Sequence, residues 1–397
     1  MPGITTPTSP TFRWVAIPSD PLVPNPGLGV LALADALVLV GTRKGLVIAR
    51  GDASRRSWAL DPMHFANKEV SAVAVDTRRS TPRILCGVSF GHFGTTVAYS
   101  DDLGRSWVET ETAPIAFPEA CGVALARIWQ LHPAPANQPD VVYAGVEPHA
   151  LFRSDDGGQS FSLVQGHWDI PDRTSWMPGG GGACLHTVVT HPDDPQWLMT
   201  VMSAGGVYRS RDGGASWVRA NRGIQQAHVP EDQRFPEFGQ CVHKVAMHPS
   251  RPSRLFAQNH FGVYRSDDAG DSWVAIEDGL PSNFGFPMVV HPENPDVLFN
   301  FPLEADMNRV PVGGRCAVYR STDAGASWHP MIEGLPSDIY YAAVLRDAMC
   351  HDGGSPAGVY FGTRVGEVFG SVDSGESWDV VATHLPDVLS VRAAVLQ

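Results

Sequence analysis

The amino-acid sequence predicts an all-β fold: a seven-bladed β-propeller of four-stranded antiparallel blades, its ring closed by the C-terminal strand joining the N-terminal blade. Three observations lead to this prediction. One short string recurs along the 397 residues, short alternating apolar runs flank each copy, and Gly and Pro are abundant while charged residues make up only 18%. Repeats of roughly 50 residues, each holding four short strands, are typical of propeller blades.

The recurring string has the pattern Ser-x-Asp-x-Gly-x-Ser-Trp. A degraded copy, "ARGDASRRSW", ends at Trp58. The six clear copies are Ser100–Trp107, Ser154–Phe161, Ser210–Trp217, Ser266–Trp273, Ser321–Trp328 and Ser371–Trp378. In a tight turn the Asp carboxylate can accept backbone N–H bonds, Gly permits a positive φ, Ser supplies a hydroxyl donor, and the aromatic ring packs between blades. The string is therefore predicted to be a structural turn.

The strands of one blade follow from the segment "CVHKVAMHPSRPSRLFAQNHFGVYRSDDAGDSWVAIEDG". Apolar residues alternate there in short runs, and turn residues separate the runs, which is the pattern of consecutive strands. The predicted strands are 241–248, 254–259, 262–266 and 272–276. The repeated string lies in the turn between the third and the fourth strand.

The first blade is one strand short. Only residues 36–42, 45–50 and 57–60 read as strands before the second blade, whereas residues 388–397 form a strand after the last repeat. We expect 388–397 to pair inward of 36–42, because this pairing removes the open edges of the ring. Residues 29–34 are the competing candidate. In this interpretation residues 1–28 form an extended N-terminal tail, and residues 29–397 form a single propeller domain.

Composition excludes some classes of partner. The net charge is −13 with 29 basic residues, so clustered cations for binding nucleic acid or an anionic membrane surface are lacking. No run reaches the roughly 18 apolar residues of a membrane span. The start "MPGITTPTSPTFRW" lacks the features of a secretory signal, so a cytoplasmic location is expected. The sequence leaves the oligomeric state open.

The repeated string resembles the Asp-box, or bacterial neuraminidase repeat, of sialidases, some xyloglucan-degrading hydrolases, sortilin-type receptors and photosystem assembly factors. The resemblance covers about residues 36–397 and implies a propeller. It does not imply one function, because in those families the motif lies on the blade periphery, away from the active site. The Phe-Arg-Ile-Pro motif of sialidases is not matched by "FRWVAIP" (12–18), which argues against a true sialidase. Two-propeller xyloglucanases are roughly twice as long.

Strand order divides the polar residues between two faces of the ring. His-Pro pairs at 132, 191, 248 and 291 end first strands and are predicted to form a repeated turn. We expect the opposite face to carry the starts of first strands, the second-to-third turns and the glycine tract "WMPGGGGACLH". Irregularities confined to one face often mark a binding face. The candidate ligand-binding residues on that face are His92, Lys244, Asn259, Arg309, Arg315 and Tyr340.

The candidate catalytic residues are His186, His243, His260 and Glu304. The sharpest hypothesis is a divalent metal, Zn, Mn or Fe, held by His186, His243 and His260 with Glu304, because imidazole and carboxylate suit these ions. No compact motif such as HExxH supports it. Two alternatives stay open. In the first, the histidines only hydrogen-bond to neighbouring residues around the channel and hold no metal. In the second, His and Glu perform metal-free acid–base chemistry while Lys244 or Arg309 holds an anion.

Three further hypotheses concern the same face. Cys184 and Cys241 each precede a candidate histidine by two residues, which permits a thiolate–imidazole nucleophile or a Cys/His metal site, although small buried cysteines explain the spacing more simply. Lyase chemistry would use His186, His243 and Tyr340 or Tyr341. A cluster of Arg127, Arg309 and Arg315 that binds a carboxylate is a third hypothesis, and no sequence motif links these three arginines.

These observations favour a propeller enzyme that acts on a small polar or carbohydrate-like ligand at the channel mouth, by hydrolase or lyase chemistry. The alternative is a non-catalytic scaffold or assembly factor that binds a protein partner.

Overall fold

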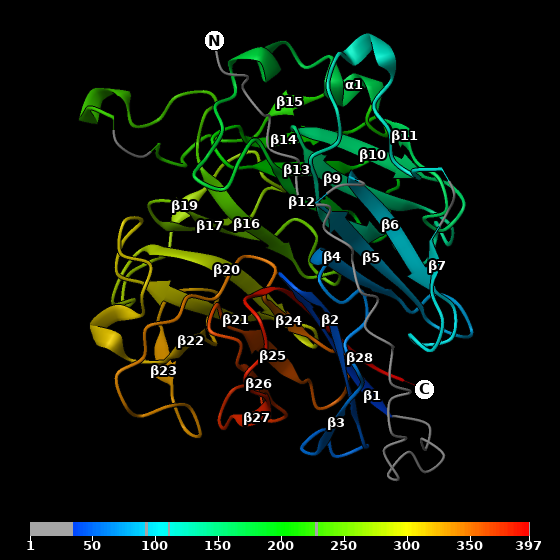
Figure 1. Cartoon of the computed structure of the whole chain (residues 1–397). Helices are drawn as coiled ribbons and strands as arrows, with labels where there is room; N and C mark the ends of the chain where they lie inside the picture. Colours follow the sequence, from blue (N-terminus) through cyan, green and yellow to red (C-terminus); the bar gives the residue numbers. More distant parts are fainter. Residues whose placement is uncertain (1–34, 92–93, 110–111, 227–228, 397) are drawn as a thin grey trace, which may run out of the picture. The chain divides into compact units, whose positions relative to one another are not determined.

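The computed structural model describes residues 35–91, 94–109, 112–226 and 229–396 (Figure 1). The predicted tail (1–28), the competing strand (29–34) and the candidate ligand residue His92 lie outside the described residues.

The described residues form seven four-stranded antiparallel sheets, as the sequence predicts (Figure 1). Their innermost strands, β28, β4, β8, β12, β16, β20 and β24, each contact the next in a closed circle. The described helical segments are short: α1 (Gln165–Trp168) and the 3-10 turns Glu119–Cys121, Pro171–Ser175, Glu231–Gln233 and Val312–Gly314. No helix in these ranges is long and apolar enough to cross a membrane.

The sheets are numbered as blades 1 to 7, each given from its innermost to its outermost strand. Blade 1 is β28 (Val388–Val395), β1 (Ala36–Thr42), β2 (Gly45–Gly51) and β3 (Trp58–Leu60). Blade 2 is β4 (Glu69–Asp76), β5 (Arg83–Phe90), β6 (Gly94–Ser100) and β7 (Val108–Glu109). Blade 3 is β8 (Arg127–Pro133), β9 (Val142–Glu147), β10 (Ala150–Ser154) and β11 (Ser162–Leu163).

Blades 4 to 7 follow in chain order with the same arrangement. Blade 4 is β12 (Leu185–Thr190), β13 (Leu198–Met202), β14 (Gly206–Ser210) and β15 (Val218–Arg219). Blade 5 is β16 (Val242–Met247), β17 (Leu255–Asn259), β18 (Val263–Ser266) and β19 (Val274–Ala275). Blade 6 is β20 (Phe284–His291), β21 (Asn294–Leu303), β22 (Val318–Ser321) and β23 (His329–Met331). Blade 7 is β24 (Met349–His351), β25 (Val359–Gly362), β26 (Val368–Ser371) and β27 (Asp379–Ala382).

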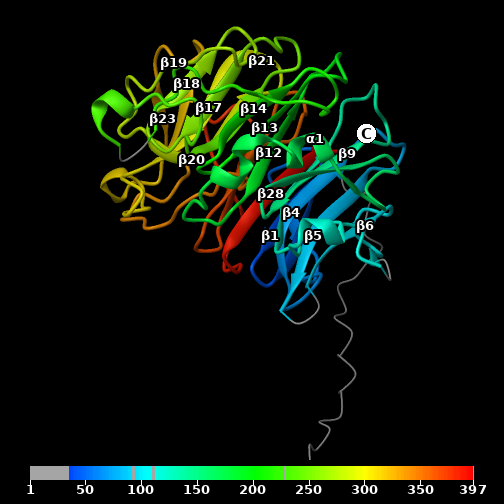
Figure 2. The same ribbon diagram turned by 90° about the horizontal axis from the view of Figure 1, so that it is seen from above.

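The ring is closed by the pairing of β28 with β1. The two strands run antiparallel with Val40 opposite Val391 and Leu37 opposite Ala394. Figure 2 shows β28, in red, beside β1, in blue. The prediction that 388–397 pairs inward of 36–42 is therefore confirmed, and blade 1 receives the fourth strand that its own segment lacks.

The repeated string forms the predicted turn. In blade 5 the Ser266 hydroxyl donates to Asp268 Oδ1 at 2.7 Å, and the Gly270 N–H donates to Ser266 Oγ at 2.9 Å. The Ser272 N–H and hydroxyl donate to the two oxygens of Asp268 at 2.8 and 2.5 Å. The same four bonds recur in all six clear copies. Gly270 has φ +88°, the conformation for which glycine is suited.

The aromatic residue that ends the string joins neighbouring blades. Trp273 of blade 5 is 3% exposed, and its indole N–H donates to the carbonyl of Ala220, next to the last strand of blade 4, at 2.9 Å. Trp328 of blade 6 bonds in the same way to Ile276 beside blade 5, at 2.8 Å. Trp273 and Trp328 thus anchor their blades to the preceding ones through the apolar layer between them, whereas the Trp217 indole N–H donates within its own turn, to the carbonyl of Gly214 at 3.0 Å.

Candidate functional site

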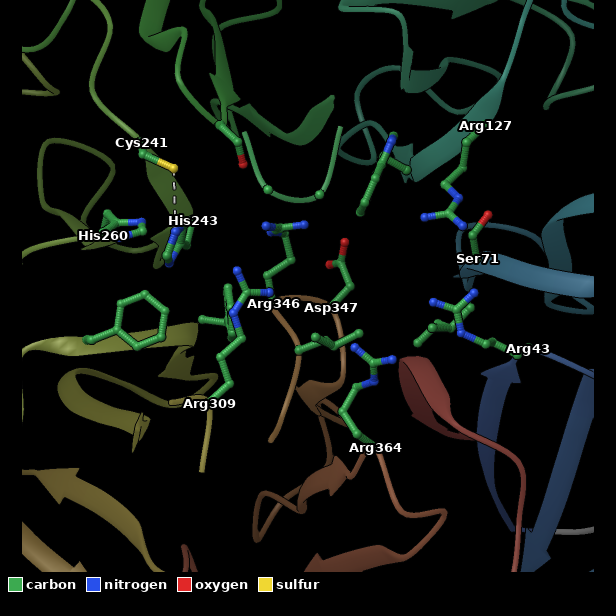
Figure 3. A pocket seen from close by; sticks show the side chains of 18 residues that line it. Arg43, Ser71, Arg127, Cys241, His243, His260, Arg309, Arg346, Asp347 and Arg364 are labelled. Carbon is green, nitrogen blue, oxygen red and sulfur yellow. Dashed lines mark hydrogen bonds between the residues drawn. The ribbon is translucent and has the colours of Figure 1, made fainter. Parts of the chain in front are cut away.

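A cavity of about 280 Å³ lies on the ring axis, and Figure 3 shows the side chains around it. Its lining takes residues from all seven blades and the segments that join them, which is why it sits at the centre of the ring. Arg43, His260 and Arg364 lie in second-to-third turns, and Arg309 lies in the long β21–β22 connection. The cavity therefore opens on the face that the strand order marks as irregular.

Arginine dominates the lining. The five arginines are Arg43, Arg127, Arg309, Arg346 and Arg364. Three of them share two carboxylates: Glu69 pairs with Arg43 and Arg127, and Asp387 pairs with Arg43 and Arg364. These ion pairs fix the guanidinium groups on the blade 1, blade 3 and blade 7 sides of the cavity.

Arg309 and Arg346 differ from the other three, because no carboxylate of the described residues lies within salt-bridge distance of either. Arg309 donates from Nε to the backbone oxygen of Asp306 at 2.9 Å. Arg346 Nε is buried without a hydrogen-bond partner in the described ranges. The guanidinium of Arg346 lies 5.3 Å from the Trp129 ring centroid and 5.7 Å from that of Phe286, and Arg309 lies 5.3 Å from Phe286. Aromatic rings therefore hold these two cations, while the terminal N–H groups of Arg309 and the guanidinium of Arg346 remain available to a ligand.

Cys241, His243 and His260 form a second group on the cavity wall, at the left of Figure 3. Cys241 Sγ lies 3.6 Å from His243 Nε2, and the ring centroids of His243 and His260 are 5.4 Å apart. Burial, together with the nearby charge of Arg346, holds the pKa of His243 well below its usual value. His243 is therefore neutral at neutral pH. Burial raises the pKa of the Cys241 thiol.

Six of the predicted site residues in the described ranges lie outside this cavity. His186 is fully buried on β12, where Gly180, Gly181 and Ser203 form the cavity wall instead. Glu304 is exposed and closes its own loop, accepting bonds from Gly313 N–H at 3.1 Å and from Asn308.

Arg315 is exposed and lines no part of the cavity. Tyr340 is 8% exposed and donates its hydroxyl to Glu367 at 2.5 Å, so it serves the packing of blade 7.

Two predicted ligand residues have supporting positions. Asn259 is fully buried and donates to the carbonyls of Gln225 and Phe261 at 2.9 and 3.0 Å, which fixes the turn that carries His260. Lys244 does not line the axial cavity and instead lines a second cavity of about 510 Å³ at the other mouth. The predicted residues that the structure brings together in the axial cavity are His243, His260 and Arg309.

The predicted His-Pro turns lie on that second mouth. His191 Nδ1 accepts the N–H groups of Asp193 and Asp194 at 3.2 and 3.1 Å, and His248 Nδ1 accepts that of Ser250 at 3.1 Å. His291 does the same for Glu293 at 3.1 Å. The turn interpretation is confirmed for these three.

Sequence reasoning did not single out Arg43, Arg346 or Arg364. A signal existed for two of them: Arg43 and Arg364 occupy the same position in "GTRKG" (41–45) and "GTRVG" (362–366), both second-to-third turns. Arg346 lies in a link between blades that matches no repeat, so only the fold brings it to the axis.

No family model matches the sequence, and no curated protein does. Solved structures share its fold. A GH74 enzyme from Niastella koreensis is 17% identical with a TM-score of 0.59, over 88% of this chain and 53% of that chain. An ancestral GH74 enzyme is 16% identical with a TM-score of 0.53, over 82% and 38%. YCF48 bound to a D1 peptide is 14% identical with a TM-score of 0.47, over 88% and 86%.

This chain spans about half the length of the Niastella enzyme, and it spans less than half the length of the ancestral enzyme. Likeness at these identities shows the propeller fold alone. The fold and the cavity together define the chain as a seven-bladed β-propeller protein with an arginine-lined axial pocket.

Proposed function

We propose that the axial cavity binds a small, glycan-like ligand that carries a carboxylate, and that the protein acts on this ligand as a hydrolase or lyase. The observation that carries the proposal is the pair Arg309 and Arg346, two cavity arginines with no carboxylate partner among the described residues. The planar guanidinium fork matches a carboxylate in two parallel hydrogen bonds.

The electrostatics of the chain support an anionic ligand. The net charge of the protein is −13, yet five arginines gather around one small cavity. A concave site lined by one sign of charge focuses the field and raises the local concentration of oppositely charged ligands. Because Glu69 and Asp387 already neutralise part of the charge of three arginines, Arg309 and Arg346 carry the remaining positive potential.

The size and walls of the cavity support a small ring-shaped ligand. At about 280 Å³ the cavity is at the lower end of the range for small-molecule sites. Trp129 and Phe286 provide aromatic faces, and a sugar ring presents C–H faces that pack against such rings while its hydroxyls reach polar groups. A uronic acid combines this body with a carboxylate.

The chemistry of the proposal is located at the Cys241, His243 and His260 wall. Glu304, the acid that the sequence suggested, lies outside the cavity, and Asp347, the acid that lines it, is paired with Lys244 and Arg392. We therefore assign the acid–base or metal chemistry to Cys241, His243 and His260. Arg346 and Arg309 lie close enough to His243 for their charges to lower its pKa, which places the anion-binding pair beside the reactive wall.

The proposal also includes membership of the Asp-box propellers. It is supported by the recurrence of one four-bond turn in the six copies of the string.

Calorimetric titration with glucuronate and galacturonate, and with the neutral sugars glucose and galactose, tests the binding step. We expect the uronates to bind and the neutral sugars not to bind. Arg346→Gln should weaken uronate binding roughly tenfold or more, since a charge-assisted hydrogen bond contributes about 1.5–3 kcal/mol. Arg211→Gln, at an arginine whose side chain is 62% exposed, is the matched control and should bind like the wild type.

Equal binding of neutral and acidic sugars, or unchanged uronate binding by Arg346→Gln, would refute the anion site. Binding of acidic peptides without any binding of uronates would instead support the scaffold alternative. Product analysis of oligosaccharides that contain uronic acids tests the hydrolase or lyase step separately.

A further inference from the structure

We propose that Cys241, His243 and His260 form a zinc site with one position open to the axial cavity. Within the described residues these three side chains offer ligand atoms that all lie within 4.8 Å of one another. This set joins Cys241 and His243, which the sequence offered as one possible Cys/His metal site, to His260 from the His/Glu hypothesis, and it leaves out His186 and Glu304.

The local fold explains why the three side chains meet. Cys241 and His243 are two residues apart at the start of β16, and this spacing directs both toward the same face of a strand. The next turn, between β17 and β18, brings His260 alongside, and its backbone N–H donates to the carbonyl of Cys241 at 2.9 Å. Asn259 holds the same turn through its two side-chain bonds. The ligand-bearing segments are thus tied together without a metal.

The measured separation fits tetrahedral coordination. Zinc bound to sulfur at about 2.3 Å and to nitrogen at about 2.0–2.1 Å, at the tetrahedral angle, places the two ligand atoms about 3.6 Å apart. Cys241 Sγ and His243 Nε2 are 3.6 Å apart. An S–H···N hydrogen bond gives a similar distance, so the test includes a readout that a hydrogen bond cannot produce.

The outer contacts prepare both imidazoles for a metal. His243 Nδ1 lies 2.6 Å from the backbone oxygen of Gly285. A carbonyl can only accept, so Nδ1 carries the proton, and Nε2 presents its lone pair toward Cys241. Asp306 Oδ2 lies 3.3 Å from His260 Nε2, which places a carboxylate beside the second imidazole. Carboxylate or carbonyl contacts of this kind orient histidine ligands in metal sites.

The donor set selects the class of metal. A thiolate with two imidazoles favours zinc over manganese, magnesium or calcium, which prefer oxygen ligands. Three protein ligands with a free fourth position are typical of catalytic rather than structural zinc sites. All three residues line the cavity that holds Arg309 and Arg346. If the proposed carboxylate ligand binds there, the zinc would supply a Lewis acid next to it; this last step rests on the proposed function, whereas metal binding does not.

The test is titration of the purified full-length protein with Co²⁺ after dialysis against a chelator, with zinc competition. We expect one Co²⁺ per chain, a near-ultraviolet sulfur-to-cobalt charge-transfer band, and displacement of the cobalt by Zn²⁺. Cys241→Ser should abolish the charge-transfer band, and His243→Gln and His260→Gln should each weaken binding tenfold or more. Asp306→Asn should weaken it by roughly 10-fold to 100-fold, as expected for an outer-shell partner.

Cys121→Ser and His329→Gln are the matched controls, because these residues lie away from the cavity; they should bind cobalt like the wild type. The wild-type measurement needs no variant to fold. A wild-type protein that binds neither ion, or that binds cobalt without the sulfur band, overturns the proposal. If the protein binds uronate but no metal, the proposed function stands and the zinc site is refuted. If it binds the metal but no uronate, the zinc site stands and the proposed function is refuted.

Discussion

Lys244 and Asp347 form a buried ion pair across the ring axis, with Nζ and Oδ1 2.7 Å apart although 103 residues separate them in sequence. Arg392 on β28 contacts the same carboxylate oxygen at 2.7 Å. Asp347 lines the axial cavity, whereas Lys244 and Arg392 line the cavity at the opposite mouth. One carboxylate therefore joins blades 5, 7 and 1 and forms a charged partition between the two cavities.

Removing the carboxylate of this partition should strongly destabilise the ring. Asp347→Asn leaves the partly buried cations Lys244 and Arg392, whose side chains are 13% and 22% exposed, without their counter-charge. Breaking a fully buried pair costs about 3–5 kcal/mol, and solvent at the two cations brings the expected cost toward the lower end of that range. Urea denaturation measures this cost as a lower free energy of unfolding. The double variant Lys244→Met/Asp347→Asn should recover part of the loss, because one buried charge is then absent. A change below about 1 kcal/mol in the single variant would contradict the interpretation.

The stability of the protein should fall as the pH drops below about 6.5. His149 is 6% exposed and His167 is fully buried near it, and burial lowers their pKa values to about 4 and about 3. The charge of Arg173 acts on both in the same direction. Between these values and 6.5 the unfolded chain binds protons that the folded chain does not, so stability rises with pH in that window and falls on acidification.

At pH 5 each of these two histidines should remove about 2 kcal/mol relative to neutral pH. His167→Gln isolates one contribution: the difference in unfolding free energy between pH 7 and pH 5 should shrink by that amount. Thr200, which lies 3.2 Å from His167 Nε2, can still bond to the amide. An unchanged pH dependence in the variant would show that His167 is already charged in the folded protein.

The repeated turns should each contribute to stability. Asp323 accepts bonds from Ser321 Oγ, Ser327 N–H and Ser327 Oγ at 2.8, 2.9 and 2.6 Å. These bonds, led by the one from the Ser327 hydroxyl, lower its pKa to about 2. Asp323→Ala should cost about 1–2 kcal/mol, reduced by solvent at this exposed site, and loosen Trp328 between blades 5 and 6.

The control for this variant is Asp193→Ala, at an exposed aspartate outside the Ser-x-Asp-x-Gly-x-Ser-Trp turns, which should melt like the wild type. Because the folded pKa of Asp323 is depressed, its contribution is present above about pH 4 and is lost as the pH falls toward 2. Melting temperatures measured at pH 7 and pH 3 check both statements. If Asp323→Ala and Asp193→Ala have the same melting temperature at pH 7, the repeated turn does not contribute to stability.

Gly182 should be required for the shape of the axial cavity. It has φ +113°, and a Cβ there would lie 2.3 Å from Glu147 Oε1. Glu147 accepts the indole N–H of Trp129 at 3.0 Å, and Trp129 is a wall of the cavity. Gly182→Ala should therefore displace Glu147 and Trp129 and weaken uronate binding. Gly122 also has a positive φ, but no atom lies within 4 Å of a Cβ added there. The control Gly122→Ala therefore carries only the cost of the backbone conformation, and this variant should bind uronate normally.

The fold could be predicted from the sequence because the same turn chemistry recurs in register. Six copies of the string fix the third-to-fourth turn of each blade, so the remaining strands follow from alternation and spacing. The closing strand followed from a count, since β1, β2 and β3 lack a partner that only Val388–Val395 supplies.

The site could be predicted only in part. Strand order placed His243, His260 and Arg309 on the face where the axial cavity opens, and all three line that cavity. His186 occupies the equivalent position to His243 in blade 4, yet the glycine tract and Ser203 form the wall there, and a sequence pattern does not show which backbone covers a side chain. Arg346 and Asp347 reach the axis from a link of irregular length, which no repeat describes.

The pairing of β28 with β1 also orders events during synthesis. The first and the last of the described strands to leave the ribosome become hydrogen-bonded neighbours, while blades 2 to 7 assemble from contiguous stretches. Until residues 388–395 emerge, β1 lacks this antiparallel partner, and an unpaired strand edge can pair with another chain. Translation through the closing segment therefore protects blade 1 against association between unfinished chains.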